Sequence, residues 1–202
     1  MIPRIEQKLE FNKNQYMDLL KWLRFKKAKI IYPERIICSR YLDTINCKMY
    51  NDTLEGIVPR KKIRIRTYGS FDFLRSKSPY SLEIKMTREH QRLKKTINNI
   101  EYNSLINDGY YDKKYGFCYE KVDVSYNREY YLVDDIRVTI DKDIQYNQIN
   151  LNKISSINVK YEKKYVLEIK TDIKKNLTFL LNNFDFPRSR FSKYERAIQS
   201  FI

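Results

Sequence analysis

The 202 residues are enough to bury one sizeable core, and we take residues 1–202 as a single domain. A formal net charge of +15 predicts an anionic partner, either a phosphate-rich small molecule, nucleic acid or an anionic membrane. A single histidine and three cysteines without a CxxC pair argue against His-based metal cages, zinc sites and disulfide scaffolds. No apolar run approaches the length of a spanning helix, so we expect a cytoplasmic protein that associates with a membrane only through another chain.

The first half of the chain alternates between strand and helix patterns. Apolar residues recur at helical spacing over 13–25, which predicts an amphipathic helix with one core face. Pro33 predicts a break in regular secondary structure, and residues 46–55 are predicted to form an irregular or short helical segment. Gly69-Ser70 offers the flexible backbone of a hairpin turn. The strands predicted in this half are 4–11, 35–43, 61–68 and 80–87.

The second half begins with a polar stretch, 88–108, which we predict to be helical and to end near Asp108-Gly109. Residues 119–140 predict two long strands that turn near 132–135, and the asparagine-rich stretch 142–157 predicts a connector. The remaining predicted elements are a strand at 159–171 and helices at 174–182 and 189–201.

Charged residues recur at a spacing of two on the predicted strands. Side chains at i and i+2 point to the same face of a strand, so these charges share one face and the intervening apolar residues share the other. The pairs are Glu6/Lys8, Arg64/Arg66, Glu83/Lys85, Glu168/Lys170 and, through Thr139, Arg137/Asp141. The alternating apolar residues are Ile63, Ile65, Leu82, Ile84, Leu167 and Ile169.

For any one strand, a charged face exposed to water is the simpler explanation. Several strands with matched acidic and basic pairs favour a closed barrel, whose lumen holds a charged ligand while helices cover the apolar face. The predicted fold class is therefore α+β, an antiparallel β-barrel tunnel of about eight strands with helices packed outside. Lys and Arg favour phosphate oxygens, and the interspersed carboxylates favour a hard divalent cation.

Short segments along nearly the whole chain resemble the VTC domain, the polyphosphate polymerase branch of the triphosphate tunnel metalloenzymes. The related CYTH phosphatases and cyclases begin with Glu-x-Glu-x-Lys, whereas this chain has Glu6-x-Lys8-x-Glu10, which favours the VTC branch. The segments are Arg4-Ile5-Glu6-Gln7-Lys8, Tyr41-Leu42-Asp43-Thr44, Lys62-Ile63-Arg64-Ile65-Arg66, Leu82-Glu83-Ile84-Lys85, Tyr126-Asn127-Arg128, Arg137-Val138-Thr139-Ile140-Asp141, Leu167-Glu168-Ile169-Lys170 and Phe191-Ser192-Lys193-Tyr194.

The resemblance implies a role for each of these charged residues. Glu168 would hold the metal, and Glu6, Glu83 and Asp141 would be orienting carboxylates or additional metal contacts. Lys94 and Lys170 would be further ligand-binding cations. Leu93-Lys94-Lys95-Thr96 departs from the denser basic cluster usual in the family, so Lys94 would take that role alone. The implied phosphate contacts are Lys8, Arg64, Arg66, Lys85, Arg128, Arg137 and Lys193.

The implied function is polyphosphate polymerase, a metal-dependent phosphotransferase that uses Mn²⁺ or Mg²⁺ to pass the γ-phosphoryl group of ATP to polyphosphate. Two alternatives stay open, an inorganic or nucleoside triphosphatase of the same fold and a non-catalytic polyphosphate-binding module. Nucleic acid is not expected as a partner, because the suggestive arginines alternate with apolar residues and no RNP, zinc-finger or helix-turn-helix pattern is present.

Overall fold

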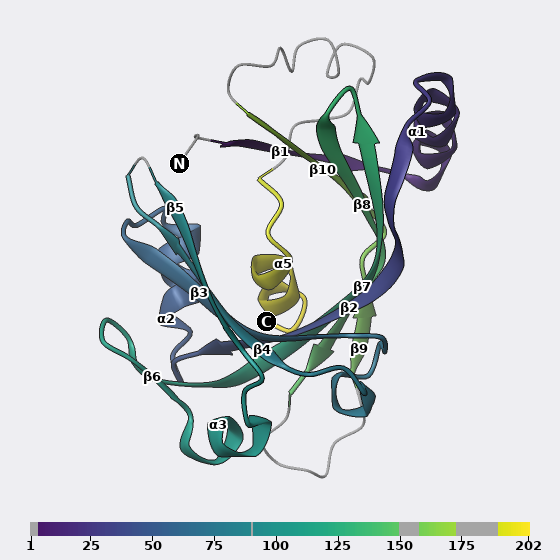
Figure 1. Cartoon of the computed structure of the whole chain (residues 1–202). Coiled ribbons are helices and arrows are strands. Elements are labelled where there is room, and N and C mark those ends of the chain that lie inside the picture. Colours follow the sequence, from purple (N-terminus) through teal and green to yellow (C-terminus); the bar gives the residue numbers. More distant parts are fainter. Residues whose placement is uncertain (1–3, 90, 150–157, 173–189) are drawn as a thin grey trace. The chain divides into compact units, whose positions relative to one another are not determined.

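The computed structural model describes residues 4–89, 91–149, 158–172 and 190–202 (Figure 1). The single histidine, His90, and the helix predicted at 174–182 lie outside the described residues. The chain divides into two compact units. Unit 1 comprises Met1–Arg35, Tyr126–Ile144 and Tyr161–Phe191, and unit 2 comprises Ile36–Ser125, Gln145–Lys160 and Ser192–Ile202. That residues 1–202 form a single domain stays a prediction.

Unit 1 is an antiparallel sheet with one helix. Its strand order is β1-β10-β8-β7. Only the parts of β7 and β8 near the turn that connects them belong to this unit. Asp134 and Asp135 form that turn with φ of 47° and 61°, within the predicted range 132–135. The elements are β1 (Arg4–Phe11), α1 (Lys13–Phe25), the beginning of β2 (Lys29–Asp43), the end of β7 (Gly116–Val133), most of β8 (Ile136–Gln148) and β10 (Tyr165–Asp172).

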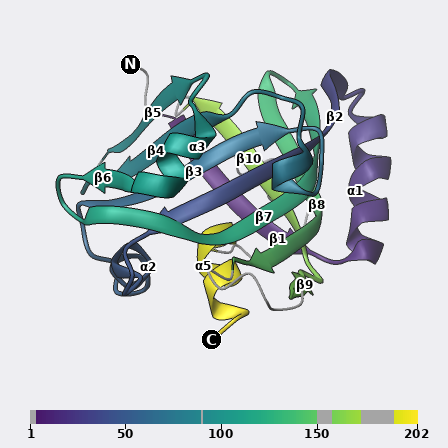
Figure 2. The ribbon, with the colours of Figure 1, turned by 90° about the horizontal axis from the view of Figure 1, so that it is seen from below.

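Helix α1 covers the apolar face of unit 1. Asn12 caps the helix: its side chain accepts from the Gln15 amide, and the Gln15 side chain accepts from the Asn12 amide. The helix buries Leu19 and Leu23 and runs alongside the strands (Figure 2). The core beneath it comprises Leu9, Phe11, Val133, Ile136, Val138, Ile140, Leu167 and Ile169, which include the apolar positions predicted on β10.

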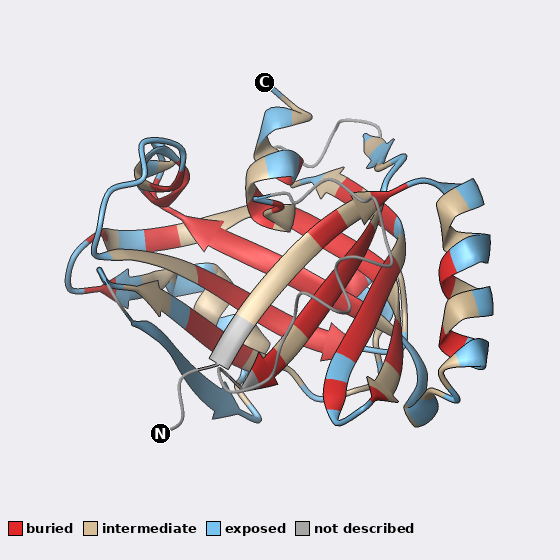
Figure 3. Ribbon diagram, turned by 90° about the horizontal axis from the view of Figure 1, so that it is seen from above, coloured by how far each residue is buried: buried red, intermediate tan, exposed pale blue. Residues whose placement is uncertain are grey.

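Unit 2 continues the antiparallel pattern in the order β7-β2-β3-β4-β5, and the short β6 pairs with β7. The buried segments of its strands are visible in Figure 3. Besides β2, β7 and β8, its elements are α2 (Lys48–Leu54), β3 (Arg60–Tyr68), the 3₁₀ turn η1 (Phe73–Arg75), β4 (Ser81–Thr87), β5 (Arg92–Asn98), α3 (Tyr102–Asp108), β6 (Tyr110–Asp112) and α5 (Lys193–Gln199). The short β9 (Val159–Tyr161) pairs with β8.

The apolar face of unit 2 is covered by short helical segments rather than by one long helix. Met49 of α2, Phe73 of η1 and Leu105 of α3 pack against the side chains of β2, β3 and β4. Ile63, Ile65, Leu82 and Ile84, the apolar residues predicted to share a face, all lie in this cluster. In both units, therefore, the alternation in the sequence separates an apolar face from a charged one.

Several predicted elements were wrong in type or extent. β2 begins at Lys29 rather than at 35, and the helix predicted at 189–201 is limited to Lys193–Gln199. The segment 88–108 is not one helix: β5 occupies Arg92–Asn98 and only α3 is helical, because β5 pairs with β4 in a continuous antiparallel register. Pro33 does not break the chain but lies in the exposed early part of β2, where a missing amide donor is tolerated. The connector begins later than predicted because β8 extends to Gln148, and the strand at 159–171 is divided into β9 and β10.

In the part of the chain that the structure describes, no helix is long and apolar enough to cross a bilayer.

Candidate functional site

Unit 2 carries a cluster of cations on one face of β3, β4 and β5. In the antiparallel register Arg64 lies opposite Glu83, Lys62 opposite Lys85, and Lys85 opposite Lys94. Directly opposed residues project to the same face, so these side chains share one surface. Tyr41 and Ser39 of β2 join it, because they pair with Arg64 and Arg66.

Glu83 is the carboxylate on which the cations of this cluster converge. Its Oε2 accepts from Arg64 Nε at 2.8 Å and Nη2 at 2.5 Å, while its Oε1 accepts from Lys94 Nζ at 2.6 Å. Arg66 Nη1 is 3.4 Å from Oε2, and Glu83 is only 3% exposed. Burial alone would raise the pKa of Glu83, but the charges of Arg64 and Arg66 hold it well below its usual value. Glu83 therefore stays ionised and fixes these cations in place.

A second set of contacts joins the charged face of unit 2 to the C-terminal helix. Tyr194 of α5 stacks on Tyr41 with ring centroids 4.9 Å apart and donates its hydroxyl to Asp43. The Tyr41 hydroxyl in turn accepts from Arg64 Nη1 at 3.0 Å. Burial and the Asp43 carboxylate raise the pKa of Tyr194 well above its usual value, so this hydroxyl keeps its proton. Helix α5 therefore packs on the charged face, whereas the helices were predicted to pack outside.

Asp43 and Lys62 make further contacts that hold α2 and the C-terminal helix α5 in unit 2. Asp43 is fully buried and accepts from the backbone amides of Thr44, Met49 and Tyr50, which fixes the start of α2. Lys62 Nζ donates to Ser192 Oγ at 2.7 Å, just before α5 begins. These contacts connect two of the short sequence segments, the one around Asp43 and the one around Tyr194, that are far apart in the chain.

Unit 1 carries the other charged cluster, on β1, β10, β8 and β7. Lys8 lies opposite Glu168, and Glu6 lies opposite Lys170. Lys170 Nζ is 2.5 Å from Glu168 Oε1 and 4.0 Å from Glu6 Oε2, so both carboxylates approach one ammonium group. Lys8 Nζ also donates to the Phe191 carbonyl at 3.2 Å.

Arg128 is a half-buried cation of the unit 1 cluster, with 12% of its side chain exposed. It forms a bidentate pair with Asp141 through Nε at 2.5 Å and Nη2 at 2.6 Å, and its Nη2 is 3.4 Å from Glu168 Oε2. Burial would raise the pKa of Glu168, but Arg128, Lys8 and Lys170 hold it well below its usual value. Glu168 is therefore an ionised oxygen donor that is only 6% exposed.

The carboxylates differ in how well they fit a divalent cation. Asp141 is occupied by the bidentate Arg128 pair and Glu83 by Arg64, Arg66 and Lys94, so both fit the orienting role rather than direct metal contact. Glu168 is also paired, with Lys170 at 2.5 Å and with Arg128 at 3.4 Å, but Glu6 approaches the same Lys170 ammonium group and so supplies a second carboxylate. One or two carboxylates suffice where substrate phosphates complete the coordination of Mg²⁺. Among the described residues no three His, Cys, Asp or Glu side chains gather into a complete metal cage.

The remaining predicted residues lie on the expected elements. Lys85 is exposed on β4, and Lys193 is half-buried in the first turn of α5. Arg137 is exposed on β8, with its guanidinium 5.7 Å from the ring centre of Tyr130. The structure thus places the predicted residues in two groups. Glu6, Lys8, Arg128, Arg137, Asp141, Glu168 and Lys170 are in unit 1, and Arg64, Arg66, Glu83, Lys85, Lys94 and Lys193 are in unit 2.

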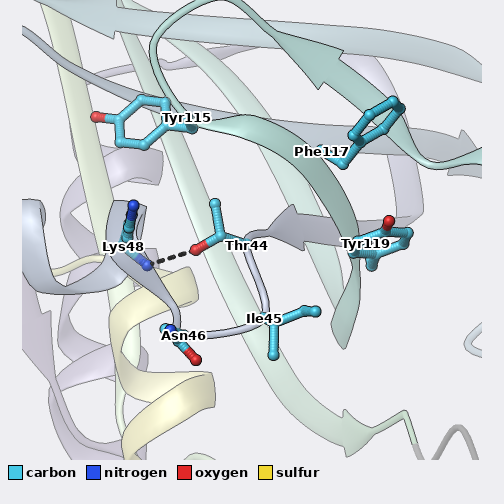
Figure 4. A pocket seen from close by; sticks show the side chains of 7 residues that line it. All are labelled: Thr44, Ile45, Asn46, Lys48, Tyr115, Phe117 and Tyr119. Carbon is cyan, nitrogen blue, oxygen red and sulfur yellow. Dashed lines mark hydrogen bonds between the residues drawn. The ribbon is translucent and has the colours of Figure 1, made fainter.

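A hollow of about 250 Å³ in unit 2 is separate from these residues (Figure 4). Within it the Lys48 amide donates to Thr44 Oγ1 at 3.0 Å. Lys48 is the one charged residue in its lining, which is too little positive charge for a polyphosphate. The lining residues are Thr44, Ile45, Asn46, Lys48, Tyr115, Phe117 and Tyr119, none of them a predicted site residue.

Comparison with known protein families gives a match along almost the whole chain. The family model described as the VTC domain matches residues 3–116 and 118–202. The chain belongs to the VTC domain family. Among curated proteins none matches this VTC domain.

Solved structures resemble this VTC domain at low sequence identity. A candidate adenylate cyclase from Bacillus halodurans is 12% identical with a TM-score of 0.60, over 98% of this chain and 96% of that one. A candidate adenylate cyclase from Vibrio parahaemolyticus is 12% identical with a TM-score of 0.54, over 97% of each chain. A Hippeastrum candidate adenylyl cyclase with a dominant triphosphatase activity is 13% identical with a TM-score of 0.61, over 98% and 96%. At this identity the likeness concerns the fold, and it confirms the predicted fold class, that of the triphosphate tunnel proteins.

Several residues that shape the candidate site of this VTC domain were not predicted from the sequence. Lys62 continues the spacing-two series of Arg64 and Arg66, so the same rule could have found it. Tyr41 and Ser192 lie inside segments that resemble the family but carry no charge, so charge patterning did not select them. The Asp43–Tyr194 bond spans 151 residues and has no local sequence signal.

Proposed function

We propose that this VTC domain is a polyphosphate polymerase that transfers the γ-phosphoryl group of ATP to the end of a growing polyphosphate chain. The observation that carries the proposal is the cation cluster of unit 2, in which Arg64, Arg66 and Lys94 converge on the single carboxylate Glu83. Cations held in place before the ligand arrives bind phosphate oxygens without first having to be ordered.

The cluster has the chemistry that phosphoryl transfer requires. The transferred group carries its charge on three oxygens, and the reaction is accelerated mainly by positioning and by fixed positive charge. In the proposal Arg64 and Arg66 contact these oxygens, and Glu83 keeps their guanidinium groups oriented. By analogy with oxyanion-hole donors, loss of one such contact would cost on the order of 3 kcal/mol of transition-state stabilisation.

The proposal assigns the divalent cation, Mn²⁺ or Mg²⁺, to unit 1. Glu168 would hold it, with Glu6 as the second carboxylate, because both oxygens already face the ammonium of Lys170. A bound divalent cation neutralises phosphate charge and polarises the phosphoryl oxygens. Asp141 orients Arg128, and Arg128 in turn faces Glu168 at 3.4 Å.

A triphosphatase is the second candidate function, favoured by the activity of the Hippeastrum protein that shares the fold. The same groups would bind the triphosphate, and water would replace the polyphosphate end as the acceptor. A polyphosphate-binding module without turnover is the third. A binding module would be favoured if the basic cluster were incomplete. Lys94 argues against this, because it lies opposite Lys85 on the charged face and so supplies the cation expected there.

The test is to incubate the purified chain with ATP and Mn²⁺ and to separate the products on a gel stained for polyphosphate. A ladder of chains is expected from the wild type and none from Glu168→Ala, whereas the exposed Glu55→Ala serves as a matched control and keeps the ladder. Release of ADP and orthophosphate without a ladder would assign the triphosphatase instead. Saturable triphosphate binding without turnover under Mn²⁺ or Mg²⁺ would leave only the binding module.

A further inference from the structure

The segment that joins α1 to β2 in unit 1 is flanked by exposed large apolar side chains, Phe25 at the end of α1 and Ile30 at the beginning of β2. Phe25 is 80% exposed and Ile30 is 72% exposed. The backbone of this turn is ordered, because the Lys27 amide donates to the Arg24 carbonyl and the Ala28 amide to the Leu23 carbonyl, both at 2.9 Å. In Figure 3 most of the ribbon from the end of α1 to the beginning of β2 is coloured as exposed or intermediate. The apolar side chains are therefore held in water by an anchored turn.

The same turn concentrates positive charge. Arg24, Lys26, Lys27 and Lys29 lie within six consecutive positions of the sequence. No acidic residue occurs between Asp18 and Glu34. Both of these flanking carboxylates are already engaged, Asp18 with Lys21 at 3.4 Å and Glu34 with Lys142 at 3.3 Å. We call Arg24–Ile30 the basic–apolar tip.

Neither half of this pattern is explained by α1 alone. A cation in the last helical turn complements the helix dipole, which accounts for Arg24 but not for the lysines beyond the helix. A soluble polyanion would use the cations and leave Phe25 and Ile30 in water. An anionic lipid surface offers both negative headgroups and an apolar layer immediately beneath them.

We propose that the basic–apolar tip docks this protein peripherally on an anionic membrane surface. Lys26, Lys27 and Lys29 would contact the headgroups, while Phe25 and Ile30 would enter the headgroup and acyl boundary, roughly 5–10 Å deep in comparable systems. This differs from the expectation that any membrane contact would need another chain. It does not depend on the proposed phosphoryl transfer, since the residues involved belong to neither charged cluster.

The test uses the full chain and two kinds of vesicle, phosphatidylcholine alone and phosphatidylcholine with 30% phosphatidylserine, at about 0.1 M salt. Co-sedimentation is expected with the anionic vesicles and not with the neutral ones. Changing Lys26, Lys27 and Lys29 together to Gln should weaken partitioning on the order of 100-fold. Phe25→Ser combined with Ile30→Ser should weaken it at least about 10-fold.

Matched control variants separate the tip from general surface properties. Leu74 is 60% exposed in unit 2, so Leu74→Ser removes a comparable apolar side chain elsewhere. Changing the exposed Lys95, Lys113 and Lys163 to Gln removes the same charge elsewhere. Both controls should partition like the wild type.

Three results would overturn the proposal. One is absence of binding to the anionic vesicles. Another is binding that the Phe25 and Ile30 changes leave intact, which would assign the tip to soluble polyanions. The third is equal weakening by the tip lysines and the control lysines, which would attribute binding to net charge alone.

Discussion

The two charged clusters of this VTC domain differ in their balance of charge. In unit 2 the single carboxylate of Glu83 forms ion pairs with Arg64, Arg66 and Lys94, so the cluster has a surplus of positive charge. In unit 1 the acids Glu6, Asp141 and Glu168 are interleaved with Lys8, Arg128 and Lys170. A surplus of fixed cations suits a polyanion, whereas ionised oxygens among cations suit a hard metal ion. One alternating strand pattern thus produces two clusters with different balances of charge.

The largest expected effect comes from changing the acids of the two clusters. Glu168→Gln should raise the Mn²⁺ concentration needed for half-maximal activity by at least about 100-fold, since even residues that only support a metal ligand cost 10–100-fold. Glu83→Gln should leave this concentration within about twofold, because Glu83 pairs with Arg64, Arg66 and Lys94 without a second carboxylate sharing those cations. Metal titrations of both variants measure the difference. A larger shift for Glu83→Gln would reverse the assignment.

The next largest effect is expected at Arg64, one of the two arginines proposed to contact phosphate. Arg64→Lys should lower kcat/KM about 100-fold, because lysine cannot reproduce the two bonds to Glu83 together with the bond to Tyr41. Lys113→Arg, at an exposed position, is the control for exchanging one cation type for the other. Steady-state kinetics with ATP as the varied substrate gives the answer. Wild-type kinetics for Arg64→Lys would remove Arg64 from the site.

A smaller effect is expected at the α5 anchor of unit 2. Tyr194→Phe keeps the ring stacked on Tyr41 but removes the hydroxyl from the buried Asp43 carboxylate. We expect the free energy of unfolding to fall by about 1–3 kcal/mol, the usual penalty for a buried charged acceptor that loses a donor. Urea denaturation measures it, with the 60% exposed Tyr111→Phe as control. An unchanged midpoint would mean that Asp43 is satisfied by its backbone donors alone.

The smallest expected effect is the loss of folding stability at acidic pH. The pKa values of Glu83 and Glu168 are lowered by folding, so each stabilises the fold above its ordinary pKa of 4.5, and this contribution is lost as the pH falls through the folded value. The urea midpoint of the wild type should therefore decrease between pH 6 and about pH 3.5. Glu83→Gln should show a shallower decrease over the same interval. Parallel pH profiles for variant and wild type would contradict the lowered pKa.

The strands of the charged clusters could be predicted from local alternation. β1, β3 and β4 follow the expected ranges closely, because each strand has one face in a core and one face that is charged. The charged strand β10 was also expected, but within a longer strand that in the structure is divided into β9 and β10. β5 could not be predicted in this way. All of its residues are exposed, so its sequence lacks the contrast between faces, and only pairing with β4 makes it a strand.

The roles within the clusters were harder to predict than their positions. Sequence spacing placed Glu83 and Glu168 in equivalent Glu-x-Lys pairs, which gave no reason to distinguish them. The difference comes from the neighbouring strand. Register sets Arg64 opposite Glu83, whereas it sets Lys8 opposite Glu168. Cross-strand neighbours are a property of the sheet, and the sequence of one strand does not contain them.

The bond between Asp43 and Tyr194 also affects the order in which unit 2 can be completed. The two residues are separated by 151 positions, so at ribosomal rates Asp43 precedes Tyr194 by roughly 8 to 30 s. During that time Asp43 can fix the start of α2, but Tyr41 lacks its stacking partner and Lys62 lacks Ser192. Until the C-terminal segment arrives, the arginines proposed to bind phosphate lack their final support in a newly made chain.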